Sequence, residues 1–416
     1  MLCLAVLVFP VSRANADPLK NERFKISGFA TLGLTQGGDE ILGHRRNAVQ
    51  DGNFDGDWSF KTDSLLGVQL DTKFTNEFNG AIQLVARERA EQSISDSIEW
   101  AYLRYRLNPK FTARVGRIGI DVFMLSEYRN VGFAYLWARP PSEFYVPFAF
   151  DYFEGADITF VSPLSSGTLS AKLFLGATEN KFEFEGEARE FSLNNGIGGN
   201  IVWENDNWKT QFGILRVDLD NNVNKAFGTD LMSEGLNNFA QIGWHEATEI
   251  ADEITANGER ITYYSLGISY NKNPWVIQAE ANYYDIGYSV IKSYRGEYLS
   301  LGHRFQDVTL FTLLSQGSPT EPRYDAPPVP GILASIPEVI QLQESVQTLF
   351  DTAFADQKTF GFGARWNIRH DLALKLQWER TKVEARGSLL WKTKEVPTED
   401  REIDTISVNL NYIFSL

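Results

Sequence analysis

Apolar and polar residues alternate along many short stretches of this chain. The clearest stretch is the last one, Ile406 to Leu416, in which even positions are apolar and odd positions are mainly polar. Successive side chains of a β-strand point to opposite faces, so this stretch predicts a strand with one apolar and one polar face. Phe24 to Gln36 has the same alternation near the other end of the chain.

Very short turns alternate with long connections between these stretches. Seven short turns are visible, and most are built from Asn, Asp, Gly or Pro. If both termini lie on the side of the short turns, seven turns require eight connections on the other side and therefore sixteen strands. The short turns are 75–77, 108–110, 163–167, 205–207, 271–274, 306–307 and 369–371.

A half-apolar strand at the very end of a chain needs a neighbour on both edges. In lipid, each unpaired backbone group on an open edge costs several kcal/mol. A closed barrel removes the edges, and its strands need only about 10 residues with every second one apolar. The pattern therefore predicts an all-β fold, a transmembrane antiparallel β-barrel of sixteen strands. No stretch reaches the roughly 18 consecutive apolar residues of a membrane helix.

Both ends of the chain resemble bacterial outer-membrane barrels. Phe414, preceded by alternating apolar residues, resembles the C-terminal assembly signal of these proteins, and SGFATLGLT at 27–35 is similar to the opening strand of Gram-negative porins. Together with the strand count, this identifies the sixteen-stranded, trimeric general porins as the family that the chain resembles. The resemblance implies the outer membrane of a Gram-negative bacterium, contact with lipid and lipopolysaccharide, and a homotrimer. Gly28, Ala30 and Gly33 would permit close packing between subunits.

The N-terminal residues have the features of a secretory signal peptide. Leu2 to Val11 is apolar, and the small residues around Ala16 suit cleavage before Asp17. We expect residues 1–16 to be a signal peptide and 17–416 to be a single barrel domain, because no linker divides the rest. Cys3 is the only cysteine, so no disulfide is expected after cleavage.

Two long connections in the second half of the chain are expected to be external loops. Residues 218–259 include a short helix over about 246–254. Residues 317–357 carry apolar residues three and four apart after a Pro-rich stretch, which predicts an amphipathic helix. We expect that helix to pack over the mouth of the barrel.

The connection from Asp121 to Asp151 is too apolar for a solvated loop. Free in water, its aromatic residues would form a large exposed apolar patch, whereas a place inside the barrel would bury them. In sixteen-stranded porins the third external loop folds inward and narrows the channel, and this loop resembles it in position. Four of its aromatic residues could stack against a sugar or an aromatic acid: Tyr128, Tyr135, Trp137 and Tyr145.

Charged residues surround this loop, and its basic neighbours are expected on the inward faces of the predicted strands two to five, with acids of the loop and its flanks opposite them. Basic residues on a narrow wall produce a strong local field, and acids across the lumen make the field transverse, as in the constriction of general porins, which this arrangement resembles. Arg114 and Arg117 are three residues apart, so a regular strand would point them to opposite faces. We therefore expect a β-bulge near Gly116 that turns both inward. In an alternative interpretation, the charges form ion pairs that only brace the strands against the loop. The basic set is Lys61, Arg87, Arg89, Arg104, Arg106, Arg114 and Arg117, and the acidic set is Asp121, Glu127, Glu143, Asp151 and Glu154.

Several functional classes find no support. The formal net charge of −15 and the absence of a dominant basic face argue against nucleic acid as a partner. Asp51 to Asp57 begins like an EF-hand, but position twelve is Thr62 instead of a bidentate Glu, so we expect a solvated acidic loop and no metal site. Loose binding of calcium or of a cation that bridges lipopolysaccharide is the alternative. The four histidines are scattered along the chain, and their spacing indicates neither a metal cluster nor a Ser-His catalytic site. We expect neither enzymatic activity nor a cofactor.

These observations favour a water-filled channel for the passive diffusion of small hydrophilic solutes and ions. A substrate-specific channel for a sugar or an organic acid is one alternative. A structural or adhesive barrel with the loop as a plug is another. The solutes that pass and the preferred ion are left open, because a slip of one residue in strand register moves whole rows of charges to the other face.

Overall fold

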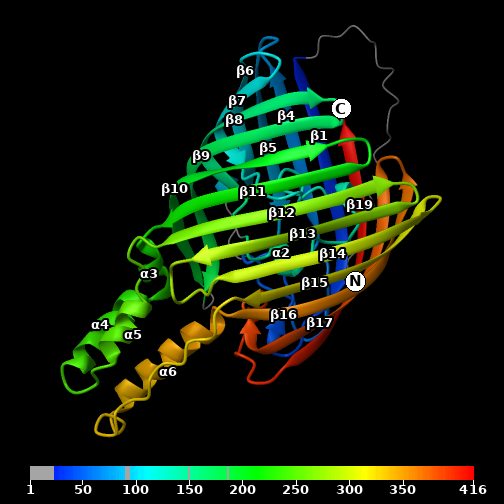
Figure 1. Ribbon diagram of the computed structural model, residues 1–416. Helices are drawn as coiled ribbons and strands as arrows, with labels where there is room; N and C mark the ends of the chain where they lie inside the picture. Colours follow the sequence, from blue (N-terminus) through cyan, green and yellow to red (C-terminus); the bar gives the residue numbers. More distant parts are fainter. Residues whose placement is uncertain (1–22, 90–93, 149, 185–186) are drawn as a thin grey trace.

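The computed structural model describes residues 23–89, 94–148, 150–184 and 187–416. The expected signal peptide therefore lies outside the described residues. The chain forms a closed antiparallel barrel (Figure 1), in which the first strand pairs with the last. The sheet has seventeen strands, but the two-residue strand β3 (Trp58–Ser59) continues the pairing of the second wall strand with the first, so the wall has sixteen. The fold class predicted from the sequence is confirmed.

Every wall strand pairs with its neighbours in the chain, as in an up-and-down barrel. The wall strands are β1 (Phe24–Gln36), β4 (Leu65–Lys73), β5 (Phe78–Arg87), β6 (Ile98–Arg106), β7 (Phe111–Gly119), β8 (Tyr152–Leu164), β9 (Gly167–Phe184), β10 (Glu187–Glu204), β11 (Trp208–Leu219), β12 (Arg260–Lys272), β13 (Trp275–Ile286), β14 (Tyr294–Phe305), β15 (Val308–Pro319), β16 (Ala355–Arg369), β17 (Leu372–Ser388) and β19 (Arg401–Ser415).

The two faces of the wall follow the alternation in the sequence. Apolar residues on the outer face are exposed, such as Leu173 at 68% and Leu266 at 62%. Polar residues on the inner face are buried, such as Thr35 and Asn409, both at 0%. A polar inner face can be buried only if something inside the barrel covers it and supplies hydrogen-bond partners.

The small residues of β1 are used for packing within the barrel. A side chain on Gly28 would overlap the ring of Phe414 on the neighbouring strand, because an added Cβ would lie 2.4 Å from that ring. Gly33 faces the lumen, where an added Cβ would lie 2.5 Å from Cβ of Asp63. Gly33 therefore cannot take part in a subunit contact, whereas the role expected for Gly28 and Ala30 on the outer face stays a prediction.

Six α-helices and one 3-10 helix are present in the described residues. They are α1 (Ile94–Ser97), the 3-10 helix η1 (Gly132–Ala134), α2 (Ser142–Tyr145), α3 (Asn222–Phe227), α4 (Thr229–Ala240), α5 (Ala247–Glu253) and α6 (Pro337–Thr352). Within the described part of the chain, no helix combines the length and the apolar character that crossing a membrane requires. Both helices predicted in the long connections, α5 and α6, are present.

The connections 220–259 and 320–354 together form what we call the helical arm. Figure 1 shows α4, α5 and α6 extending away from one end of the barrel, with α6 in contact with α4. The expectation that α6 packs over the barrel mouth is therefore wrong. The arm contains thirteen acidic residues, eight in 220–259 and five in 320–354, against Lys225 and Arg323, so its net charge is −11. The buried apolar residues of the arm belong to the same cluster as those of the adjoining end of the barrel, and α6 contacts β17 as well as α4.

A second small sheet lies near the loop end of the barrel. Strand β2 (Leu42–Gly43) pairs with β18 (Lys392–Thr393), and the Arg45 guanidinium donates hydrogen bonds to the carbonyls of Leu389 and Leu390. We call residues 37–57 the cap. His44 of the cap is buried beside Trp391, and burial, followed by the charge of Arg139, lowers its pKa well below the usual value.

Candidate functional site

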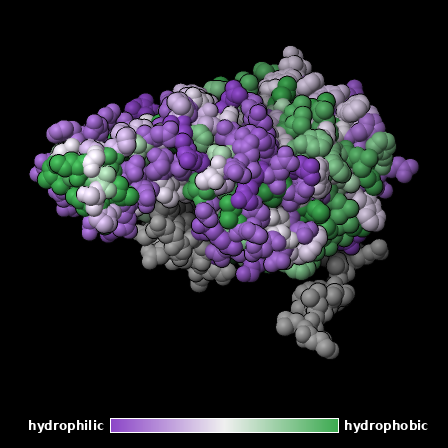
Figure 2. All heavy atoms as spheres, turned by 90° about the horizontal axis from the view of Figure 1, so that it is seen from below, coloured by the Kyte–Doolittle hydropathy of each residue, from purple (hydrophilic) through white to green (hydrophobic). Residues whose placement is uncertain are grey.

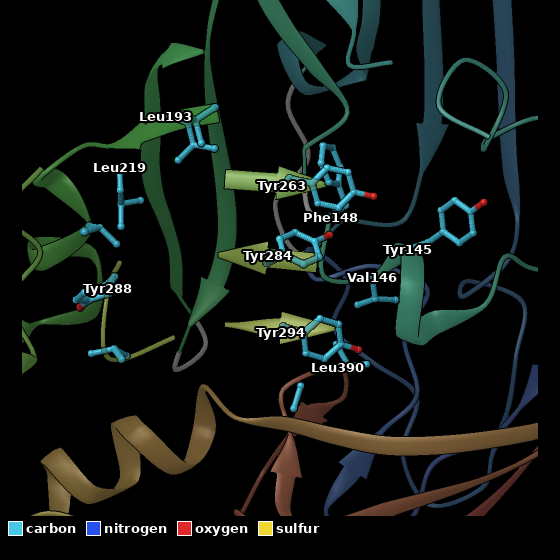
Figure 3. Close-up of a cluster of buried hydrophobic side chains, with 14 of the residues drawn as sticks. Tyr145, Val146, Phe148, Leu193, Leu219, Tyr263, Tyr284, Tyr288, Tyr294 and Leu390 are labelled. Atoms are coloured by element: carbon cyan, nitrogen blue, oxygen red, sulfur yellow. The ribbon is translucent and has the colours of Figure 1, made fainter. Parts of the chain in front are cut away.

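The connection from Asp121 to Asp151, here called the inner loop, packs against the inner face of the barrel. Its Phe148 contacts Tyr263 of β12, and Tyr263 contacts Tyr284 of β13, each pair with ring centroids about 5 Å apart. Figure 3 shows these tyrosines and Tyr294, from three neighbouring strands, pointing toward the segment that carries Val146. The inward fold of the loop, predicted from its apolar composition, is confirmed.

Glu143 at the start of α2 anchors the loop to the strands β15 and β16. Its carboxylate accepts hydrogen bonds from the Ser315 hydroxyl at 2.6 Å, from the Gln357 amide at 2.7 Å and from the Thr359 hydroxyl. The side chain is 1% exposed. Glu143 was expected to face wall arginines across the lumen, but its partners are neutral donors, so it serves as an anchor.

Lys375 of β17 holds the middle of the inner loop. Its ammonium group donates to the carbonyls of Gly132, Tyr135 and Trp137 at 2.5 to 2.6 Å, and the side chain is fully buried. Three donors on one ammonium match three acceptors, so a segment without regular structure has its buried carbonyls satisfied.

Two further buried groups attach the loop to the wall. The Glu280 carboxylate on β13 accepts hydrogen bonds from the Met124 amide at 2.8 Å and from the hydroxyl of Tyr145. Arg139 of the loop forms an ion pair with Glu379 on β17. The inner loop is thus attached to strands on the far side of the barrel from β7 and β8, where it begins and ends, so it spans the lumen.

The end of the loop nearer to β5–β9 is held by ion pairs, which we call the loop–wall network. Asp151 pairs with Arg87 and Arg129. Arg114 pairs with Asp157 at 2.5 Å and with Glu127 at 3.5 Å. The five cations of the network are Arg87, Arg89, Arg114, Arg129 and Lys172, and its five carboxylates are Glu99, Asp121, Glu127, Asp151 and Asp157.

A small cavity of about 10 Å³ lies between the loop and the wall beside this network. Phe29 of β1 and Trp100 of β6 line it on the wall side, and Tyr128 lines it on the loop side. Glu127 and Asp151 contribute carboxylates to its surface. The cavity thus combines aromatic faces with charges that are already paired.

Arg104 and Arg106 occupy inward positions of β6, as expected. Arg104 lies opposite Asn79 and Arg114 in the sheet. In the described part of the chain, no carboxylate lies within ion-pair distance of either arginine, and the Nε atom of Arg104 is buried without a hydrogen-bond acceptor. Arg104 lies over the ring of Tyr102, and Arg106 is exposed, so both keep a positive charge that no neighbouring carboxylate among the described residues compensates.

Three of the expected pore-lining residues lie elsewhere. The register between β7 and β8 is continuous, so no bulge forms at Gly116 and Arg117 lies on the same outer face as Val115. Arg117 pairs on that face with Glu154 at 2.6 Å. Lys61 lies in an exposed turn between β3 and β4. Their expected inward placement is therefore wrong, because the arginine spacing was interpreted as a bulge and the second strand begins later than expected.

The aromatic residues proposed for stacking are mostly unavailable. Tyr135, Trp137 and Tyr145 are at most 7% exposed. Trp137 also donates its indole N–H to Ser300 at 2.7 Å. Tyr128 is the one member of this set that lines the cavity.

Sequence reasoning missed several residues that hold the loop. Lys172, Glu280, Lys375 and Glu379 are ionisable residues on inward positions of strands whose other face is apolar. Their position on the polar face of an alternating stretch was a usable signal. Arg129 and Arg139 lie in the loop itself, where no alternation marks which side chains face the wall.

Comparison with solved structures supports the fold. OmpF of Salmonella typhi, in a complex with daunomycin, is 12% identical with a TM-score of 0.51, covering 94% of this chain and 97% of that chain. The outer-membrane channel DcaP of Acinetobacter baumannii is 9% identical with a TM-score of 0.52, at the same coverage. No protein-family model and no curated protein matches the sequence. At these identities the likeness concerns the fold, and the chain has the porin fold.

Proposed function

We propose that the protein is an outer-membrane channel through which small hydrophilic solutes and ions diffuse passively. The observation that carries the proposal is the inner loop, which spans the lumen of a closed barrel and narrows it beside a wall on which Arg104 and Arg106 have no ion-pair partner among the described residues. A polar lumen with fixed charges and a constriction sorts solutes by size and charge without a covalent step.

The outer face of the barrel supports a place in the membrane. Apolar side chains with exposed fractions near or above one half, such as Leu310 and Phe362, would be unfavourable in water. Exposed aromatic residues lie at the turn ends of the strands, where a lipid interface favours them: Phe74, Trp208, Trp275, Phe305 and Trp366. Figure 2 shows apolar surface over part of the barrel.

The proposal is tested by the conductance of the purified full-length protein in planar lipid bilayers. We expect stepwise insertion of channels with a steady, ohmic conductance. A protein that inserts into bilayers, retains the β-rich circular dichroism spectrum of a barrel and yet conducts no ions would contradict the proposal.

One observation favours the plugged barrel as a second candidate. The inner loop is packed closely against the wall, and the cavity left beside it holds only about 10 Å³, far below the 300 to 1,000 Å³ of a typical ligand pocket. A silent barrel that becomes conducting when the loop is shortened would support this candidate. Saturable flux with one class of solute would instead support a substrate-specific channel.

Assembly and surroundings are part of the same proposal. We propose contact with outer-membrane lipid and lipopolysaccharide, and a homotrimer, as the resemblance to general porins implies. The molecular mass of the detergent-solubilised protein, corrected for bound detergent, tests the homotrimer directly. A mass equal to one chain would contradict the homotrimer.

A further inference from the structure

We infer that this channel selects anionic solutes, although the protein as a whole carries a net charge of −15. The inference rests on the proposed channel function and concerns the lumen on the side of the short turns. It follows from which charges of the lumen are already paired and which are not.

The loop–wall network carries no net charge. Its five cations and five carboxylates are joined by ion pairs, so the carboxylates of the inner loop have their partners within the protein. The transverse field expected from acids facing an arginine wall is therefore largely cancelled at the constriction. A passing ion would meet the charges that remain.

Three carboxylates outside the network, one in the inner loop and two on wall strands, are buried away from the solute. Glu143, Glu280 and Glu379 are at most 5% exposed, and each is bonded to donors of the protein. Two further carboxylates lie on inward strand positions near the turns. Asp71 lies directly opposite Lys25, and Glu204 lies directly opposite Lys209, so each has a cation as its cross-strand neighbour.

Unpaired cations remain on two sides of the turn-side lumen. On one side are Arg104 and Arg106 of β6, the second of which is exposed. On the other side are Arg304 of β14 and Arg365 of β16, which both lie opposite Thr309. In the described residues, neither of the latter two has a carboxylate within ion-pair distance.

The hydrogen-bond partners of the second pair are neutral. Arg304 donates to the Asn271 amide oxygen at 2.5 Å, and Arg365 donates to the Tyr135 carbonyl at 2.8 Å and lies over the ring of Phe133. Neutral acceptors leave the positive charge in place, and both arginines are partly exposed, unlike Glu143 and Glu280, which keep their own charge but are buried. Four arginines facing a polar lumen thus produce a positive potential that concentrates anions.

The negative charge of the protein lies mainly elsewhere. The helical arm accounts for −11 of the total of −15 and extends away from the barrel (Figure 1). At physiological ionic strength a charge is screened beyond about 8 Å. The arm therefore has little effect on the potential in the turn-side lumen, and the total charge is a poor guide to selectivity.

The test is the zero-current potential of the full-length protein in a bilayer under a KCl gradient. We expect a sign that corresponds to preferred chloride flux, with a larger preference at 0.1 M than at 1 M salt, because screening by salt weakens the potential of the arginines. The charge-reversing double variant Arg104→Glu/Arg106→Glu is expected to shift the ion preference toward potassium. Arg304→Glu is expected to shift it in the same direction. Where a reversal impairs folding, the Gln variants replace it.

The matched control is Arg295→Glu/Arg380→Glu, which makes the same charge change on exposed arginines of the outer face. It should leave the potential unchanged. Potassium preference in a conducting wild-type channel would overturn the anion inference and leave the channel function intact. A shift of equal size in the control would overturn the assignment to the lumen arginines. Absence of conductance would overturn the proposed function, and the inference with it.

Discussion

The inner loop and the helical arm are both long insertions between neighbouring strands, yet one folds into the barrel and the other extends away from it. The inner loop places Phe144 and Trp137 against the wall, both at most 1% exposed. The arm leaves Leu231, Ile242 and Ile332 more than half exposed, and Figure 2 shows apolar surface at its outer end. Position in the chain therefore does not decide where an insertion folds.

The difference follows from what each insertion can bury. The inner loop offers large apolar groups and a few polar groups, and each of its buried anchors finds a matching partner on the wall. The arm offers thirteen carboxylates, and burial of an unpaired carboxylate costs several kcal/mol. The inner loop could enter the lumen because the wall supplies partners for most of its buried polar groups, whereas the arm carries too many carboxylates for such burial.

Removing the best anchor of the inner loop should have the largest effect. In Lys375→Met, three buried loop carbonyls lose their common donor. At about 1 kcal/mol for each unsatisfied acceptor, the low end of the usual cost, loop docking should weaken by roughly 3 kcal/mol. We expect faster tryptic cleavage within the loop and noisier, higher conductance.

The control for this change is Lys358→Met on the outer face of the neighbouring strand β16, where the lysine is exposed. It alters the same residue type without touching the loop. Equal cleavage rates for both variants would mean that the loop is held by its apolar contacts alone.

Acidification should loosen the cap, which is fixed to the second small sheet. His44 is buried, and its pKa lies well below the usual 6.5, so its imidazole stays neutral in the folded cap. The unfolded cap takes up a proton as the pH falls below about 6.5, whereas the folded cap does not, so stability is lost on the acidic side of that value. We expect proteolysis of residues 37–57 to be faster at pH 5 than at pH 7.5.

The variant His44→Gln should abolish most of this pH dependence. His245→Gln changes an exposed histidine of the arm and should preserve it. If the acid-induced cleavage persists in His44→Gln, the sensitivity arises from another group.

The contrast between the two insertions was only partly visible in the sequence. The strands and their faces were predictable from local sequence. In a stretch such as Ile406 to Leu416, every second residue faces lipid and must be apolar, while the residues between them face the polar lumen. The apolar composition of the inner loop was also sufficient to predict that it enters the barrel. The direction of α6 was not predictable. The apolar face of an amphipathic helix indicates that this face is buried, but it does not indicate which part of the protein buries it.

The site was predicted less well than the fold. Five of the arginines occupy the predicted positions in or next to inward-facing strand segments, because side chains alternate strictly between the two faces of a strand. They are Arg87, Arg89, Arg104, Arg106 and Arg114. Arg117 was misplaced through an assumed bulge: Gly116 does have a φ of 129°, but the register is kept. Which arginines are neutralised could not be predicted, because Asp151 and Arg87 are brought together by the fold of the loop.

Neutralising the arm should have a small effect on the channel. The exposed acids Asp230, Glu234, Glu246 and Glu249 can be changed together to Asn and Gln without disturbing a buried contact. Screening should confine their field to the arm, so we expect unchanged conductance and an unchanged zero-current potential at 0.15 M salt. A marked gain in anion preference would show that the arm acts on the channel entrance.

The smallest effect is expected for Arg117→Ala, which separates the outer from the inner arginines. Arg117 pairs with Glu154 on the outer face, where the glutamate side chain is 62% exposed, and such a pair contributes about 0 to 1 kcal/mol. Ion preference should stay at the wild-type value, whereas Arg104→Ala, which removes an unpaired lumen charge from the adjacent strand, should shift it toward cations. The comparison uses one residue type and one substitution on neighbouring strands, and the two arginines differ mainly in face and pairing. Equal shifts in the two variants would mean that Arg117 also reaches the lumen, and the register of β7 against β8 would then have to be revised.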